Sequence, residues 1–264
     1  MPREKRILAD VGLNNLPFPM RVVSKIDKEG QSTIGNISIK ARIIQEYEAY
    51  WINKFIQIIH THRDKIGTKT LRSNIHDYID ELKATSVKID FEYPFFMEKV
   101  TPVSHEKCLV KYNCTYSAKI TATEPEPKII FKIAVPVITT DPSSDPSQKN
   151  RLFGQLSIVN LKIQSKENIY AEDLVNIVDK RALAPVYSFL TAEDQLKIID
   201  KVHLYSQSSV VMANEIQNDL AKRPDIDWYS VKCNNYSLLH SYNTLVATEK
   251  SMWIPSSCYD FEEL

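Results

Sequence analysis

The sequence predicts an α+β protein built from two tandem modules of antiparallel sheet with helices. Segments that alternate polar and apolar residues, as half-buried strands do, recur in both halves of the 264-residue chain. Between them lie segments with apolar residues at three- and four-residue steps, the spacing of amphipathic helices. A short proline-rich stretch, Glu124–Pro127, separates the halves. The repeated order of segments indicates an internal duplication of one antiparallel unit.

In the first half, the alternation over residues 36–45 predicts a strand, and the helical spacing over residues 46–63 predicts a helix. A second helix is expected over 73–84, with Ser73 as its N-cap. Strands are then expected at residues 86–96, 107–121 and 128–139.

In the second half, the strand-like segments are residues 154–164, 226–234 and 243–249. Helices are expected at residues 170–183, 191–203 and 207–222. The chain therefore divides into an N-terminal module at 1–125, a C-terminal module at 126–254 and a flexible tail at 255–264.

The charge balance restricts the class of partner. Lys plus Arg and Asp plus Glu both number 33, so the formal net charge is zero. Sequence-independent binding to nucleic acid needs a basic footprint, so nucleic acid is not an expected partner. A small basic pocket for one phosphorylated ligand remains compatible with this balance.

Other features of the composition point to a cytoplasmic protein with no membrane partner. No apolar run reaches the length of a membrane span, and the charged N-terminus has no apolar core behind it. No glycine-rich phosphate loop is present. The cysteines have no metal-binding spacing and are expected to be small core or surface residues: Cys108, Cys114, Cys233 and Cys258.

One turn carries the strongest functional signal. The β-branched run Val135–Thr140 predicts a strand that delivers Asp141 to a Pro/Ser/Asp turn. This segment resembles the metal-binding turn of the type IB GTP cyclohydrolases, in which the strand leads into Cys-Pro-Cys. Asp141 and Ser143 occupy the positions of the two cysteines.

Four further segments resemble the same family, in order, from residue 10 to about residue 245. They are Asp10–Pro19, Phe95–Ser104, Ala184–Leu190 and the stretch from Trp228 to His240. The resemblance implies a tunnelling fold (T-fold) of two antiparallel modules with helices packed on one face. It also implies homo-oligomers, dimers or tetramers, with active sites between subunits, and opening of the imidazole ring of GTP by a metal-activated water.

The positions that the resemblance assigns to metal ligands are mostly replaced. The ligand cysteine corresponds to Asp141, and the only surviving ligand histidine is His240. The other ligand positions correspond to Leu156, Gln195 and Asn234. Leucine cannot bind a metal, and neutral amides are weaker ligands than carboxylates.

Two other family elements are also changed. The glutamate that grips guanine corresponds to Asn214 or, with a one-residue shift, to Glu215. The family's Lys-Gly-Thr-His-Met-Ser-Arg signature corresponds to Glu48–Lys54, which includes Trp51.

These replacements predict a divergent family member that acts on a small heterocyclic, purine-like or pterin-like molecule without a cofactor, with a role in a specialised biosynthetic pathway. One alternative is a GTP cyclohydrolase with a relocated Zn, Mn or Fe site on Asp141 and His240. Another is a non-catalytic binding or interaction protein that keeps the oligomeric frame.

Asp141 and His240 are the candidate acid–base pair. The opposing interpretation is that Asp141 only caps its own turn, as an Asx-turn residue, and that His240 is structural. The candidate substrate-binding residues are Gln195, Asn234, Asn214, Glu215, Lys99 and Trp51. Each has a simpler explanation: inert replacements for the amides, a solvated helix face for Glu215, an ordinary exposed lysine for Lys99, and a filled pocket for Trp51. Glu193 and Asp194 either recruit a shifted metal or cap a helix.

Overall fold

A computed structural model describes residues 8–44, 51–145, 147 and 152–250. Its strands are β1 (Leu8–Val22), β2 (Gln31–Ile44), β3 (Ala84–Val100), β4 (Lys107–Thr121), β5 (Glu124–Thr140), β6 (Gly154–Ser165), β7 (Ala184–Pro185), β8 (Ile226–Tyr236) and β9 (Asn243–Glu249). Its helices are α1 (Trp51–His62), α2 (Thr68–Leu82), α3 (Ala171–Arg181), α4 (Ala192–Leu204) and α5 (Ser209–Ala221). The α+β class is therefore confirmed.

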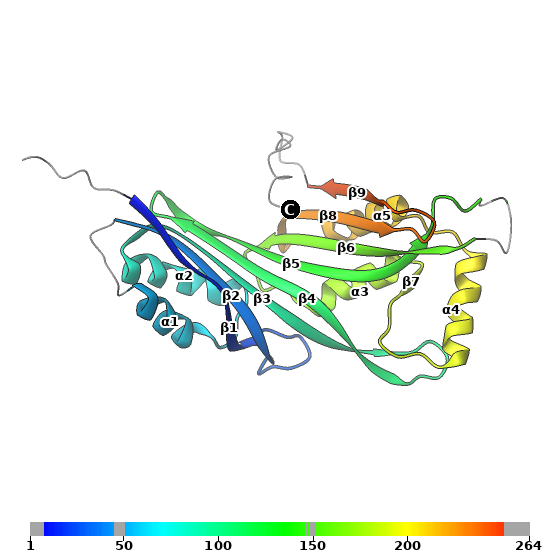
Figure 1. Ribbon diagram of the computed structural model, residues 1–264, viewed down its shortest axis with the longest axis horizontal. Coiled ribbons are helices and arrows are strands. Elements are labelled where there is room, and N and C mark those ends of the chain that lie inside the picture. The colour runs from blue at the N-terminus through cyan, green and yellow to red at the C-terminus, as the bar shows by residue number, and fades with distance from the viewer. Residues whose placement is uncertain (1–7, 45–50, 146, 148–151, 251–264) are drawn as a thin grey trace, which may run out of the picture.

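All the named strands belong to one antiparallel sheet. Its order is β1-β2-β3-β4-β5-β6-β8-β9, and the short β7 pairs with β5. Helices α1 and α2 lie along the half of the sheet that β1–β4 form, and α3 and α5 lie along the other half (Figure 1). Helix α4 stands at the far end, beside the β3–β4 hairpin.

The alternation of apolar and polar residues that predicted the strands also decides which face of the sheet the helices cover. In β3, Val87, Ile89 and Phe91 are buried, whereas Ser86, Lys88 and Asp90 between them are only half-buried. The buried side chains of both halves form one continuous apolar core. The opposite, helix-free face of the sheet is therefore lined by polar side chains.

The structure corrects the second predicted helix. Helix α2 begins at Thr68, with Gly67 as the N-cap, and Ser73 lies inside the helix rather than capping it. Thr68 and Leu71 are buried, so packing against the sheet extends the helix N-terminally past the point where the hydroxyl of Ser73 suggested a start. Lys83, with a φ of 48°, ends the helix in the left-handed region.

Strand β1 was not predicted. Its register against β2 shifts between Leu13 and Leu16, and Asn15 has a φ of 54°, so the alternation is interrupted by a bulge. Pro17 and Pro19 also lie in β1, which is an edge strand and tolerates the lost N–H donors.

The proline-rich stretch is part of the sheet rather than a linker. Glu124 opens β5 and pairs with Thr121 across a tight hairpin, and pairing of β5 with β6 starts only at Ile130. The prolines thus occupy a part of β5 that has a neighbour on one side only. The division of the chain into two modules stays a prediction, and its boundary falls within one continuous sheet.

The described cysteines lie in the core, as predicted. Cys108, Cys114 and Cys233 are buried and free, and burial raises the pKa of Cys233 to about 12. Cys258 and the predicted tail lie outside the described residues. None of the described helices is both long and apolar enough to cross a membrane.

Candidate functional site at the end of strand β5

Asp141 follows the last residue of β5 and is fully buried. Its backbone N–H donates to the carbonyl of Phe153 at 3.0 Å, which ties the turn to the start of β6. Its Oδ1 accepts from the N–H of Ser143 at 2.8 Å, and its carbonyl accepts from the N–H of Ser144 at 3.0 Å. Asp141 therefore does make the Asx-turn that the sequence allowed.

The turn leaves the second carboxylate oxygen unused. Oδ2 of Asp141 is buried and has no well-formed hydrogen bond to any described residue. Burial alone would raise the pKa of Asp141, but the hydroxyls of Ser237 and Ser143, the N–H of Ser143 and the charge of His240 together lower it below its usual value. Asp141 is thus an anion at neutral pH.

His240 belongs to the loop between β8 and β9, which lies beside the Asp141 turn. The ring is exposed and stacks on Tyr242, with centroids 4.9 Å apart. The charge of His240 makes the smallest of the contributions that lower the pKa of Asp141, although the two residues lie almost 100 positions apart in the sequence.

A chain of hydrogen bonds connects the end of β5 to Glu215. Thr140 and Gln207 exchange two hydrogen bonds, at 2.9 Å and 2.7 Å. The side-chain amide of Gln207 then donates to Oε2 of Glu215 at 3.0 Å. On α5, Glu215 faces inward and is half-buried, whereas Asn214 is exposed. Sequence reasoning missed Gln207, which was placed at the start of the helix predicted over 207–222 and instead lies just before α5 and its N-cap Ser208.

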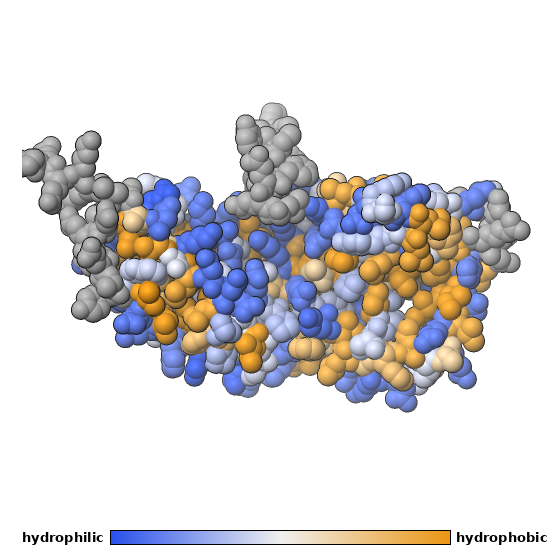
Figure 2. Space-filling view, viewed as in Figure 1, coloured by the Kyte–Doolittle hydropathy of each residue, from blue (hydrophilic) through white to orange (hydrophobic). Residues whose placement is uncertain are grey.

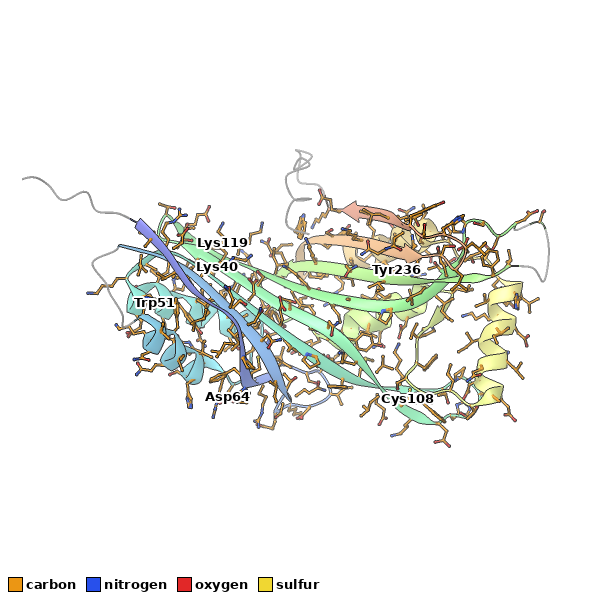
Figure 3. The ribbon with its side chains drawn as sticks, in the orientation of Figure 1. Lys40, Trp51, Asp64, Cys108, Lys119 and Tyr236 are labelled. Atoms are coloured by element: carbon orange, nitrogen blue, oxygen red, sulfur yellow. The ribbon has the colours of Figure 1, made fainter. Side chains whose placement is uncertain are left out.

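Three other candidates lie away from Asp141 within one chain. Asn234, on β8, lines a groove of about 550 Å³ on the helix-free face. Gln195 is exposed on α4, and its side-chain amide donates a long hydrogen bond of 3.5 Å to the carbonyl of Leu190. Trp51 opens α1 at the opposite end of the molecule from the β8–β9 loop, which follows Tyr236 (Figure 3), and packs edge-on against Phe55.

Lys99 is not the exposed lysine that the sequence allowed. Its side chain is almost fully buried, and Nζ lies 2.5 Å from Oδ2 of Asp179. The ammonium also lies 5.5 Å from the ring centroid of Tyr112 and 5.7 Å from that of Tyr187. Burial raises the pKa of Asp179 even though Lys99 opposes the shift. Sequence reasoning missed Asp179, because helical spacing predicts its position on α3 but not the lysine with which it pairs.

Asp194 is a structural clamp rather than a metal ligand. It completes a capping box with Thr191 at the start of α4. Its Oδ1 accepts from the N–H groups of Val103 and Ser104 at 2.8 Å and 3.0 Å, and its Oδ2 accepts from the Ser104 hydroxyl at 2.7 Å. Although burial opposes ionisation, these hydrogen bonds hold the pKa of Asp194 well below its usual range.

Asp194→Asn is therefore expected to lower Tm at neutral pH by roughly 5–10 °C. The sign of the pH dependence follows from the lowered pKa. The carboxylate contributes stability above its ordinary pKa of about 3.8, and this contribution is lost as the pH falls below that value. The Tm difference between wild type and Asp194→Asn should shrink from about pH 5 to about pH 3. The exposed neighbour Glu193 provides the control, and an effect of Glu193→Gln equal to that of Asp194→Asn would contradict the prediction.

A divalent metal finds only part of a site in the described residues. No group of three or more His, Cys, Asp or Glu side chains gathers in residues 8–44, 51–145 and 152–250. The carboxylate of Asp141 and the exposed ring of His240 on the β8–β9 loop are two suitable donors. A catalytic zinc site usually has three protein ligands, so this part of the chain does not complete one by itself.

Comparisons with known proteins point to one family. A family sequence profile described as "Type I GTP cyclohydrolase folE2" matches residues 2–246. GTP cyclohydrolase FolE2 of Geobacter sp. (strain M21) is 27% identical over 244 residues, covering 92% of this chain and 90% of that protein. The FolE2 of Dictyoglomus turgidum (strain DSM 6724 / Z-1310) is 28% identical over 247 residues, covering 94% of each.

Solved structures support the fold. The uricase from Arthrobacter globiformis aligns with a TM-score of 0.56 at 9% identity, covering 97% of this chain and 98% of that one. The urate oxidase from Bacillus sp. TB-90 aligns with a TM-score of 0.57 at 9% identity, covering 92% and 99%. The predicted tunnelling fold, with helices on one face of an antiparallel sheet, is confirmed.

Proposed function

We propose that this chain binds GTP and opens the imidazole ring of GTP at the end of β5, because the chain belongs to the type I GTP cyclohydrolase FolE2 family. The observation that carries this proposal is the buried, ionised carboxylate of Asp141 in the turn after β5, together with His240 on the β8–β9 loop. Both residues occupy positions at which the family resemblance places metal ligands.

Family membership corrects two expectations from the sequence. The relatives are named GTP cyclohydrolase FolE2, so a divergent enzyme with altered chemistry on another heterocycle is not supported. The expectation that no cofactor is needed is wrong, because the ring-opening chemistry of this family is metal-dependent. The alternative of GTP hydrolysis with a relocated metal site accounts better for these matches.

In this proposal Asp141 and His240 are the residues of this chain that would hold the metal. A divalent metal, when bound, would lower the pKa of the attacking water. Asp141 supplies a fixed negative charge, because its turn holds the carboxylate through Oδ1 and leaves Oδ2 available. His240 is exposed, so its ring nitrogens are accessible to a metal ion.

Glu215 is proposed to grip the guanine base. The guanine edge presents two adjacent N–H donors, which match the two oxygens of a carboxylate. Glu215 faces inward and is oriented by Gln207, whereas the exposed Asn214 has neither the charge nor the position. These two observations support the proposal that the one-residue shift is the correct alignment.

The active enzyme is proposed to be a homo-oligomer with sites between subunits. Apolar side chains gather over the end of the molecule that carries α4 (Figure 2). Large exposed apolar side chains there and on the nearby loops include Leu156, Phe189, Leu196, Ile199, Leu238 and Leu239. Apolar side chains exposed close together in this way are typical of protein interfaces. A subunit contact would also bring Gln195, on α4, nearer to a site than one chain does.

The proposal is tested with purified full-length protein, GTP and added Zn, Mn or Fe. We expect loss of the purine chromophore, with metal retained at a fixed stoichiometry after dialysis. GTP binding without turnover in any metal would contradict the proposal and favour the non-catalytic alternative. Loss of GTP without ring opening would indicate phosphate hydrolysis and would also contradict it.

The same assay discriminates between Glu215 and Asn214. Glu215→Gln is expected to weaken GTP binding by roughly tenfold or more, because one charge-assisted hydrogen bond is lost. Asn214→Ala, on the neighbouring exposed position, is the matched control and should bind GTP like the wild type. The reverse result would show that the unshifted alignment is correct.

A further inference from the structure

A row of lysines crosses the helix-free face of the sheet in the N-terminal half. The strand register places Lys40 opposite Lys88, Lys88 opposite Lys119, and Lys119 opposite Lys128. These four residues, called the lysine row below, lie on β2, β3, β4 and β5. Figure 3 shows Lys40 and Lys119 at the same end of the sheet, in a hydrophilic part of the surface (Figure 2).

The register and the burial pattern show that the row lies on one face. Directly paired residues of antiparallel strands project to the same side. The chain neighbours Ile39, Ala41, Val87, Ile89 and Ala118 are buried against the helices. The lysines between them therefore project to the opposite side.

Very little negative charge offsets the row. Lys88 lies 3.6 Å from Asp90, whereas no described carboxylate forms an ion pair with Lys40, Lys119 or Lys128. Like charges directly opposite each other on neighbouring strands destabilise a sheet. Lysines often protect edge strands from pairing, but β3 and β4 are internal strands of this sheet, so that explanation does not apply.

A cavity lies over the row. It has a volume of about 550 Å³ and is lined by Lys40, Lys88, Lys119 and Arg42, together with small and polar residues. Asp10 is the only carboxylate among its lining residues, and it is already held by Arg42 in a bidentate pair at 2.8 Å and 3.1 Å. Among the described residues, Asp90 is the only carboxylate that forms an ion pair with one of the lysines that line the cavity.

On the β1 side, the position opposite Lys40 is Gly12, which has no side chain to cover the lysine. A Cβ at this position would come within 2.3 Å of the carbonyl oxygen of Ile39, so the close approach of the two strands requires glycine there. The cavity therefore stays open above Lys40.

We infer that the lysine row binds an oligophosphate anion. Neighbouring strands are about 4.8 Å apart, so the three lysines that line the cavity span about 10 Å, a length suited to several linked phosphoryl groups rather than one. Each ammonium can donate charge-assisted hydrogen bonds to phosphate oxygens. The binding energy would include relief of the repulsion within the row.

This site is separate from the proposed reaction site. Lys128 and Asp141 lie at opposite ends of β5, thirteen residues apart, which corresponds to about 40 Å along a strand. The anion is either free oligophosphate or the phosphate tail of a nucleotide, and both sources present the same chemistry to the lysines.

The test uses inorganic tripolyphosphate as the probe, titrated calorimetrically into the full-length protein at low ionic strength. We expect saturable binding that weakens as NaCl is added. Lys119→Gln should lower the affinity roughly tenfold or more, through the loss of charge-assisted hydrogen bonds. Its Tm without ligand should not fall, because the substitution relieves repulsion, and its GTP turnover should match the wild type.

Lys28→Gln is the matched control, since it removes the same charge from an exposed turn between β1 and β2. Equal loss of affinity in Lys28→Gln and Lys119→Gln would show that the affinity depends only on net charge, and this would overturn the inference. Unchanged binding in Lys119→Gln, or no saturable binding in the wild type, would also overturn it. Competition by GTP, but not by guanosine, which lacks phosphate, would identify the phosphate tail of a nucleotide as a ligand of the lysine row. Failure of GTP to compete would identify free oligophosphate as the ligand.

Discussion

Asp141→Asn is expected to reduce GTP turnover by about 100-fold or more while the protein stays folded. Asparagine keeps the oxygen that accepts the N–H of Ser143, so the turn after β5 can form. It removes the negative charge and replaces one carboxylate oxygen with an amide nitrogen, which cannot bind a cation. The measurements are kcat with GTP and the Tm of the same preparation.

Asp145→Asn is the matched control, because Asp145 is an exposed residue of the same turn region. It should leave kcat close to the wild-type value. If Asp141→Asn lowers Tm but not kcat, Asp141 is only the Asx-turn residue, and the proposed reaction site at the end of β5 is wrong.

Lys99→Met is expected to destabilise the protein by about 3–5 kcal/mol, because it leaves the carboxylate of Asp179 buried without its partner. Methionine retains much of the apolar stem that packs between Tyr112 and Tyr187, so the effect reports mainly on the charge. The free energy of unfolding, measured with urea, is the readout, and Tm should fall by roughly 10 °C.

The double variant Lys99→Met/Asp179→Leu separates charge from packing. A buried ion pair replaced by apolar residues of similar volume is often neutral in stability, so most of the loss should be recovered. A Lys99→Met protein of wild-type stability with a raised KM for GTP would instead show that Lys99 leaves Asp179 to bind an anionic group of the substrate, the role first considered from the sequence.

The elements with regular periodicity could be predicted from the sequence, and the irregular ones could not. Strand β4 matches its predicted range because its residues alternate without interruption. Strand β1 was missed because a bulge and two prolines break that alternation, and only its pairing with β2 reveals it. The start of α2 depended on the burial of Thr68 and Leu71, which no local pattern shows.

The candidate site was predictable in part. The strand before Asp141 and its turn chemistry placed a carboxylate at a strand end, and the turn is there. The inward position of Glu215 and its link through Gln207 to Thr140 depend on how α5 packs against the sheet. Family resemblance proposed both Asn214 and Glu215, and the structure shows that Asn214 is exposed whereas Glu215 is half-buried against Gln207.

By itself, the sequence determined the α+β class, the antiparallel strands and the presence of a family turn at Asp141, because these follow from local periodicity and short motifs. Only the tertiary structure decided which charged and polar groups meet: Lys99 with Asp179, Asp194 with the Val103–Ser104 turn, and the four lysines of the row with each other. These contacts join residues far apart in the chain. They depend on strand register and helix packing, which the pattern of any single segment does not contain.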